Sequence, residues 1–236
     1  MEWLSRTELL LGKEGIEKLQ KAHVLVAGVG GVGSYAAEMI VRAGVGEVTL
    51  IDADVVKPSN RNRQLPALSS TEDQLKVDVM ARRLLDINPY VKINKIDYFI
   101  RQELIPEILN QKLDYVVDAI DSLSPKVFLI VRTLEREIPL ISSMGAGGKL
   151  DPAQVRLADI SESYNCKLAR MIRKRLTKFG IKKGFEVVFS PEEVNKDHVI
   201  FVEDEQNKKT TVGTISYMPA LFGIMAASQV IRKLTE

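Results

Sequence analysis

Glycines and acids that could bind a nucleotide lie in the first quarter of the chain. Residues 28–33 read Gly-Val-Gly-Gly-Val-Gly, and Asp52 and Asp54 follow about twenty residues later. Glycines let a phosphate approach the backbone amides, and an acid at that distance can accept hydrogen bonds from ribose hydroxyls. The residues that this pattern assigns to a nucleotide site are Gly28, Gly30, Gly31, Gly33, Asp52 and Asp54.

Three further charged residues favour ATP over a dinucleotide. Arg63 and Lys76 follow the acid pair, and Asp121 comes after an apolar segment at 115–117. Arginine and lysine neutralise the charge that builds up on phosphates during nucleotidyl transfer, and a carboxylate can hold Mg²⁺. Each residue could instead be a solvated surface charge or a helix cap. An NAD-dependent oxidoreductase, which needs no cations aimed at a triphosphate, is therefore one alternative.

These residues need a framework that brings several strand ends together. The apolar run at 22–27 predicts a strand, 34–40 a helix, 48–51 a second strand, and 53–72 a long functional loop. Spacing predicts further helices at 7–20, from Ser70 or Thr71 to 87, 101–110, 122–136, 168–179 and 217–231, and strands at 91–96, 115–117, 139–142, 155–157, 185–189 and 199–202. Alternating strands and helices indicate a doubly wound, Rossmann-like, mostly parallel α/β sheet, with ligands beyond the carboxyl ends of the strands.

The pattern changes after residue 150. We expect a nucleotide-binding domain at 1–150 and a smaller C-terminal α+β appendage at 151–236, packed on it. Residues 167–183 carry eight basic residues and no acid, with apolar residues at helical spacing. Such a stripe is an electrostatic footprint for nucleic acid, although a charge run is more often a solvated face. The candidate RNA contacts are Arg170, Arg173, Lys174 and Lys178.

The composition limits the partners and the compartment. The chain has 33 Lys and Arg against 31 Asp and Glu, so any surface for nucleic acid must be local. Its one cysteine, Cys166, excludes an internal disulfide and a CxxC zinc site and fits a reducing cytoplasm. The longest apolar stretch, 217–231, is shorter than the ~20 residues that a membrane span needs. We therefore expect a cytoplasmic protein without a membrane span.

Taken in order, the motifs resemble the ubiquitin-activating (E1-like) superfamily, which includes adenylating enzymes of molybdopterin and thiamine biosynthesis. The resemblance implies ATP and Mg²⁺ as cofactors, with Asp52 on the ribose, Lys76 on the phosphates and Asp121 as the Mg²⁺ ligand. It also implies a homodimer in which Arg6 reaches the phosphates of the neighbouring subunit. The implied catalytic residues are Arg6, Arg63, Lys76 and Asp121, and the further nucleotide contacts are Gly31, Ser59, Asn60, Asn62 and Ser122.

The second half of the chain distinguishes the branches of this superfamily. Sulfur-carrier activators usually have paired CxxC zinc ligands, which this sequence lacks. Residues 120–126, 138–152, 158–160, 167–170 and 187–190 are instead similar to the tRNA threonylcarbamoyladenosine dehydratase branch. That likeness implies that ATP activates the threonylcarbamoyl carboxylate on adenosine 37, in the anticodon loop of tRNA. An internal nucleophile then closes a ring and expels AMP. A cysteine desulfurase is a further partner that the likeness allows.

Asn165-Cys166 departs from this pattern, because the family often has an Asp-Pro pair there. Cys166 invites comparison with the thioester chemistry of ubiquitin-activating enzymes, but a cyclisation needs no enzyme thiol. Two alternatives to the dehydratase hypothesis stay open beside the oxidoreductase. One is an adenylyltransferase that activates the C-terminus of a ubiquitin-like sulfur-carrier protein, and the other is a nucleotide-sensing RNA-binding module.

Overall fold

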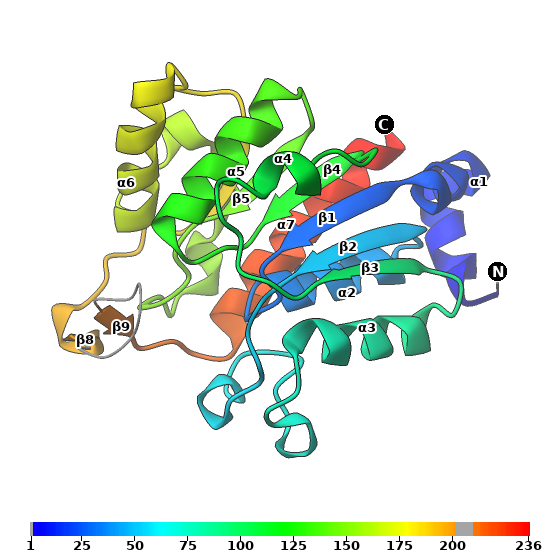
Figure 1. Ribbon diagram of the computed structural model, residues 1–236, viewed down its shortest axis with the longest axis horizontal. Coiled ribbons are helices and arrows are strands. Elements are labelled where there is room, and N and C mark those ends of the chain that lie inside the picture. The colour runs from blue at the N-terminus through cyan, green and yellow to red at the C-terminus, as the bar shows by residue number, and fades with distance from the viewer. Residues whose placement is uncertain (1, 202–209) are drawn as a thin grey trace.

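A seven-stranded sheet forms the centre of the computed structural model, which describes residues 2–201 and 210–236 (Figure 1). The strand order is β3-β2-β1-β4-β5-β7-β6, and all neighbours are parallel except β6 and β7. The strands are β1 (His23–Ala27), β2 (Glu47–Ile51), β3 (Lys92–Ile96), β4 (Tyr115–Asp118), β5 (Leu140–Ser143), β6 (Arg156–Asp159) and β7 (Glu186–Phe189). The order reverses between β1 and β4, where doubly wound sheets open a crevice for a ligand. The predicted fold class is confirmed.

Helices cover both faces of the sheet because the inner strands are apolar on both sides (Figure 1). In β1, Val24 and Val26 pack into one core, and Leu25 and Ala27 pack into the other. The helices on the first face are α1 (Ser5–Lys21), α2 (Gly33–Arg42), α3 (Lys76–Ile87) and α7 (Tyr217–Thr235), and those on the second are α4 (Ile105–Ile108), α5 (Leu123–Glu135) and α6 (Lys167–Leu176). A second, two-stranded antiparallel sheet pairs β8 (Val199–Phe201) with β9 (Thr210–Val212).

The prediction that Ser70 or Thr71 caps α3 is wrong, because that helix begins at Lys76. Residues Ser69–Thr71 form a 3₁₀ turn of their own. In this turn the Thr71 hydroxyl donates to the carbonyl of Pro66 at 2.6 Å. Its side chain is therefore engaged before the helix starts. The helix expected at 101–110 is also much shorter, since α4 has only four residues.

The chain after residue 150 continues the same sheet. Strand β7 pairs with β5 in the register Ser142↔Val187, and β6 adds an antiparallel edge. Helix α7 packs along α2 so closely that a Cβ on Gly223 would collide with the carbonyl of Val32. The predicted appendage thus shares its sheet and core with residues 1–150. Within residues 2–201 and 210–236, none of the helices has the length and apolar character to span a bilayer.

Candidate active site

The glycine turn at residues 28–33 connects β1 to α2 and lies against the loop that follows β4. Gly28 has a φ of +87°, and a Cβ there would lie 2.8 Å from the carbonyl oxygen of Ala119. A Cβ on Gly33, which begins α2, would collide with the carbonyl of Gly28. In the described part of the chain, no hydrogen bond engages the amides of Gly30 and Gly31. A phosphate can therefore approach these amides at the N-terminus of α2.

Asp52, directly after β2, connects the glycine turn to the backbone of Asp54. Its carboxylate accepts hydrogen bonds from the amides of Val29 at 2.8 Å and Asp54 at 2.9 Å. Burial raises the pKa of Asp52, and the Lys76 ammonium 4.0 Å away opposes that shift. Because two backbone donors hold the carboxylate, its remaining lone pairs keep a fixed direction at the strand end. A ribose hydroxyl could use them.

Lys76 is the first residue of α3, and its ammonium is buried between two aspartates. The Nζ atom lies 2.7 Å from the Asp54 carboxylate, while the lysine side chain is only 6% exposed. The Lys76 amide also donates to the Asp54 carbonyl at 3.0 Å, and Val55 forms a β-bridge with Leu75. These contacts close the two ends of the loop at 55–75. They explain how a lysine distant in sequence returns to the end of β2, where a phosphate could replace one of its carboxylate partners.

The loop at 55–75 folds Arg63 against the glycine turn. A Cβ on Gly31 would lie 3.4 Å from the Arg63 carbonyl oxygen. The Arg63 guanidinium donates to the Ser59 carbonyl at 3.0 Å and to the Asn62 side chain at 2.7 Å. Asn62 in turn donates to the Thr214 carbonyl at 2.9 Å, which ties the loop to the segment before α7. These loop contacts position the guanidinium beside the turn.

Asn60 has a more local contact, since its side chain accepts the Lys57 amide at 3.0 Å. Ser59 belongs with Asn60 to the 3₁₀ turn Pro58–Asn60 and is exposed. The structure therefore brings the predicted loop residues to one place beside the glycine turn. Their contacts with a nucleotide stay predictions.

A fully buried ion pair lies beneath the loop that carries Asp121. The Nζ atom of Lys126 is 2.9 Å from the carboxylate of Asp118, and both side chains are 0% exposed. Ser142 donates to the same carboxylate at 2.6 Å, and Lys126 also donates to the Ile120 carbonyl at 3.0 Å. A buried pair with its remaining hydrogen bonds satisfied holds the surrounding backbone in one arrangement. The pair thereby fixes the loop between β4 and α5.

Asp121 is exposed on this loop, near the glycine turn. The Ser122 hydroxyl donates to its carboxylate at 3.3 Å, and Ala119, two residues earlier, donates its amide to Ala27 at 2.8 Å. Among the described residues there is no group of three or more His, Cys, Asp or Glu side chains that could hold a metal. A magnesium ion at Asp121 would take its other ligands from phosphates and water, which is its usual arrangement in nucleotide sites. The donor set fits that ion.

The basic helix α6 separates apolar and cationic residues cleanly. Ala169, Ile172 and Leu176 are buried in the core shared with α5. Four exposed cations, three in α6 and one in the 3₁₀ turn Thr177–Phe179 that follows it, occur at spacings of three and four and therefore lie along one stripe. We call this the cationic stripe, and its members are Lys167, Arg170, Lys174 and Lys178.

Two other arginines of α6 are engaged within the protein. The Arg173 guanidinium donates to the Ser163 carbonyl at 2.8 Å and is half-buried. Its predicted contact with RNA stays a prediction, but its structural partners are already in place. Arg175 donates to the Ser124 hydroxyl at 2.8 Å, in the first turn of α5. Arg175 therefore connects α6 to the helix that follows Asp121.

Arg6 does not join the site of its own chain. It is exposed at the start of α1, and the neighbouring Leu4 packs on Gly44, which follows α2. In Figure 1, α1 lies at the opposite end of the strands from the cyan loop that follows β2. The Cys166 thiol is buried in the core beside α6.

Sequence reasoning gave no role to Lys126, although a lysine among apolar helix residues, five positions after Asp121, was a usable signal. It also missed Thr214 and Pro219, which contact the loop at 55–75 and Gly31 from the far end of the chain. No local pattern marks contacts between residues so distant in sequence.

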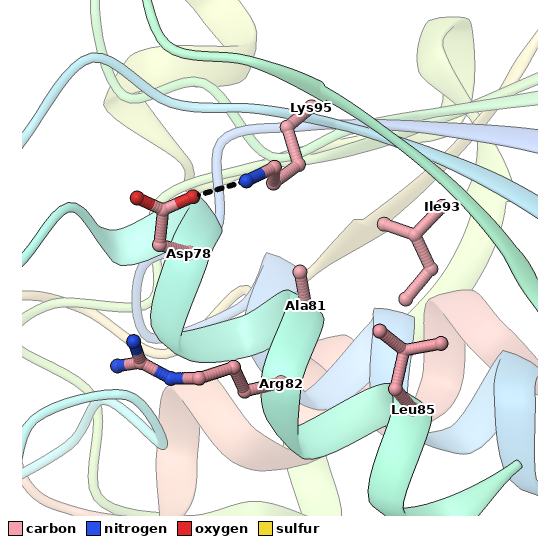
Figure 2. Close-up of a pocket in the computed structure, with 6 residues that line it drawn as sticks. All are labelled: Asp78, Ala81, Arg82, Leu85, Ile93 and Lys95. Atoms are coloured by element: carbon pink, nitrogen blue, oxygen red, sulfur yellow. Dashed lines mark hydrogen bonds and ion pairs between the residues drawn. The ribbon is translucent and has the colours of Figure 1, made fainter. Parts of the chain in front are cut away.

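A surface hollow between α3 and β3 lies apart from these residues (Figure 2). Asp78 and Lys95 face each other across it at 2.6 Å. Its lining residues are Asp78, Ala81, Arg82, Leu85, Ile93 and Lys95. None of the predicted site residues lines it, and β3 is the edge strand, two strands from β1. The hollow is therefore not the nucleotide site.

Comparisons with known proteins find relatives that match nearly the whole chain. The ThiF family matches residues 4–236. The tRNA threonylcarbamoyladenosine dehydratase of Bacillus subtilis (strain 168) is 42% identical over 239 residues, which are 98% of this chain and 94% of that protein. The molybdopterin-synthase adenylyltransferase of Salmonella typhimurium is 33% identical over 153 residues, which are 65% of this chain and 60% of that protein.

Solved structures give the same result. The E. coli tRNA N6-threonylcarbamoyladenosine dehydratase in complex with ATP matches with a TM-score of 0.90 at 34% identity, over 99% of this chain and 93% of that chain. The complex of the same E. coli protein with AMP matches with a TM-score of 0.87 at 35% identity, over 97% and 92% of the two chains. The chain belongs to the ThiF family and, within it, to the tRNA threonylcarbamoyladenosine dehydratases.

Proposed function

We propose that this chain uses ATP to activate the threonylcarbamoyl carboxylate on adenosine 37 of tRNA and then cyclises it, with net loss of water. The observation that best supports the proposal lies at the carboxyl edge, by which we mean the edge of the sheet where its parallel strands end. The glycine turn, Lys76 and Asp121 lie at its centre, and α6 reaches it through the hydrogen bond from Arg175 to Ser124. This arrangement supports a proposed ATP site next to a proposed RNA-binding surface.

The first step forms an acyl adenylate. A carboxylate oxygen of the substrate attacks the α-phosphorus of ATP, the bond to the β-phosphate breaks, and pyrophosphate leaves. Lys76 and Arg63 place positive charge beside the phosphates, and Asp52 orients the ribose. Magnesium, held at Asp121 when bound, supplies further charge neutralisation.

The second step closes the ring. A nucleophile within the threonylcarbamoyl group attacks the acyl carbon and loses its proton, and the bond between the acyl carbon and the AMP oxygen breaks. The former carboxylate oxygen leaves on AMP, so the substrate loses the elements of water. No enzyme thiol takes part, which agrees with the burial of Cys166. The protein's task in this step is to hold the adenylate and exclude water.

The proposal includes a homodimer in which Arg6 completes the site of the other subunit. Arg6 is exposed on α1, and the same helix exposes Leu9 and Leu10 to 88% and 84%. Mixing inactive Arg6→Ala protein with inactive Asp121→Ala protein should restore part of the activity, because one site of each hybrid dimer keeps both residues. If verified heterodimers stay inactive, Arg6 acts within its own chain or not at all.

Mass spectrometry of tRNA nucleosides tests the function directly. Purified protein, ATP, Mg²⁺ and tRNA that carries threonylcarbamoyladenosine should yield a nucleoside lighter by one water, together with an equal amount of AMP. NAD in place of ATP should give no product, and calorimetry should detect tighter binding of ATP-Mg²⁺ than of NAD. Unchanged tRNA, combined with adenylation of a sulfur-carrier protein that ends in Gly-Gly, would instead support the adenylyltransferase alternative.

A further inference from the structure

We propose that Tyr164 and Arg156 form a clamp for an unstacked nucleobase of the anticodon loop, beside the reacting adenosine. This inference rests on the proposed function and adds a base-binding subsite to it. Tyr164 lies three residues before the start of α6, and 45% of its surface is exposed. Single-stranded RNA loops are commonly recognised by bases that stack on aromatic side chains and on guanidinium planes. The clamp is defined by the Tyr164 ring and the Arg156 guanidinium.

The turn that carries Tyr164 is held rigidly. Ser163 is buried, its hydroxyl donates to the Ile160 carbonyl at 2.6 Å, and its own carbonyl accepts the Arg173 guanidinium at 2.8 Å. On the other side, Asn165 adopts a left-handed φ of +49°, which fixes the chain direction into α6. An aromatic side chain on such a turn loses little conformational freedom when a ligand binds. Tyr164 is therefore preorganised for binding.

One face of the Tyr164 ring is supported by the core and another is covered only by a flexible, exposed arginine. Phe189, which is buried, contacts the Tyr164 ring at 71° with the centroids 5.8 Å apart and supports it from the core. The guanidinium carbon of Arg156 lies 5.8 Å from the Tyr164 centroid. That distance exceeds the ~3.5–4.0 Å of direct carbon contact, and Arg156 is exposed. A small outward movement of the flexible arginine would admit a base between the guanidinium and the ring.

The clamp lies on the same edge of the sheet as the nucleotide site. Arg156 begins β6 and pairs with Phe189, the last residue of β7, so both are at the carboxyl end of that strand. Strand β6 is three places from β4 in the sheet order, which at the usual spacing of neighbouring strands is about 14 Å. That separation places the clamp outside the adenylation site. A neighbouring nucleotide of the loop fits it better than the reacting adenosine does.

Charge complementarity supports RNA as the occupant. The cationic stripe begins at Lys167, three residues after Tyr164, and continues through Arg170 and Lys174. Phosphates of the loop would contact the stripe while one base turns into the clamp. The two kinds of contact respond differently to salt, because only phosphate contacts release counterions. This difference makes the clamp testable separately from the stripe.

The first test measures the affinity for an anticodon stem–loop RNA by fluorescence anisotropy at several salt concentrations. Tyr164→Ala should weaken binding about 5- to 100-fold without changing the slope of log affinity against log salt. Tyr164→Phe should bind like the wild type, because the stacking surface is retained. Tyr90→Ala is the matched control, since Tyr90 is 76% exposed and lies beside Trp3. Wild-type affinity in Tyr164→Ala, or an equal loss in Tyr164→Phe or Tyr90→Ala, would overturn the clamp.

A second test reports stacking itself. An RNA with 2-aminopurine beside position 37 should lose fluorescence on binding to the wild type and to Tyr164→Phe, but not to Tyr164→Ala. Arg156→Ala combined with Tyr164→Ala should cost less than the two single changes together, because both side chains act on one base. Fully additive losses would contradict the clamp. A wild-type chain that bound no stem–loop would overturn the proposed function as well, whereas normal binding by Tyr164→Ala would overturn the clamp alone.

Discussion

Lys126 in α5 and Lys174 in α6 are lysines on neighbouring helices, yet their ammonium groups have opposite surroundings. Lys126 is 0% exposed and paired with Asp118, whereas Lys174 lies on the exposed cationic stripe. A buried charge stays in one place only while its partners are present, but an exposed charge is solvated without them. The stability and activity of the central part of the carboxyl edge should therefore depend on individual residues. The affinity of the stripe for RNA should depend on the number of its cations.

The strongest test of this comparison removes the buried lysine. Lys126→Met should lower the free energy of unfolding by about 3–5 kcal/mol, because it leaves the Asp118 carboxylate buried and unpaired. Urea denaturation of the purified protein measures the loss. Lys174→Met is the matched control, with an expected change of at most about 0.5 kcal/mol. Equal stability of the two variants would show that the buried pair of Lys126 and Asp118 does not contribute to the free energy of unfolding.

Asp121→Ala should give the next largest effect. Loss of one preorganised electrostatic group typically lowers the rate by about 10²–10³-fold. Pyrophosphate exchange measures that rate, and the protein should remain folded because Asp121 is exposed. The control is Asp86→Ala, since Asp86 is an exposed acid on α3. If Asp121→Ala keeps the wild-type rate, another carboxylate, such as Asp54, holds the metal.

Reversal of two stripe cations tests the other region. Lys174→Glu with Lys178→Glu should weaken tRNA binding and reduce the salt slope by at least about 1.4, since each phosphate contact contributes roughly 0.7–0.9. Lys13→Glu with Lys21→Glu changes the net charge equally on α1 and should leave the slope unchanged. Arg173 is left intact because its guanidinium holds Ser163. An unchanged affinity for the stripe variant would make the stripe a solvated face.

The smallest expected effect concerns Glu38, a buried acid with partly exposed partners. Burial alone would raise its pKa, but the hydrogen bonds from Arg83 at 2.5 Å and Arg42 at 2.8 Å outweigh burial and lower that pKa. Glu38→Gln should cost about 1–2 kcal/mol of unfolding free energy at neutral pH. Since the folded pKa is the lower one, the contribution exists above the unfolded pKa and disappears as pH falls through the folded pKa. The difference between wild type and variant, measured by thermal unfolding, should therefore vanish in acid.

The central part of the edge could be predicted from the sequence because its signals are local. A glycine turn after an apolar run, and acids that follow strands closely, need only neighbouring residues to be recognised. The structure places Asp52 directly after β2 and Asp121 three residues after the end of β4. Burial is not a local property. The sequence therefore did not reveal that Lys126 is buried and paired with Asp118, nor that Arg173 faces the Ser163 carbonyl while Lys174 faces solvent. The predicted start of α3 was wrong for a related reason. Leu75 forms a β-bridge with Val55, so the helix begins only at Lys76.

The close packing of α7 on the glycine turn has a consequence for the growing chain. Residues 28–76 contain the turn, the acid pair and Lys76, and they leave the ribosome early in synthesis. Pro219 and Gly223 pack against Gly31 and Val32, and Thr214 anchors the loop at 55–75. A nascent chain without these residues lacks part of the proposed nucleotide site and leaves the apolar side of α2 uncovered. Unfinished chains should therefore be substrates for chaperones rather than consumers of ATP.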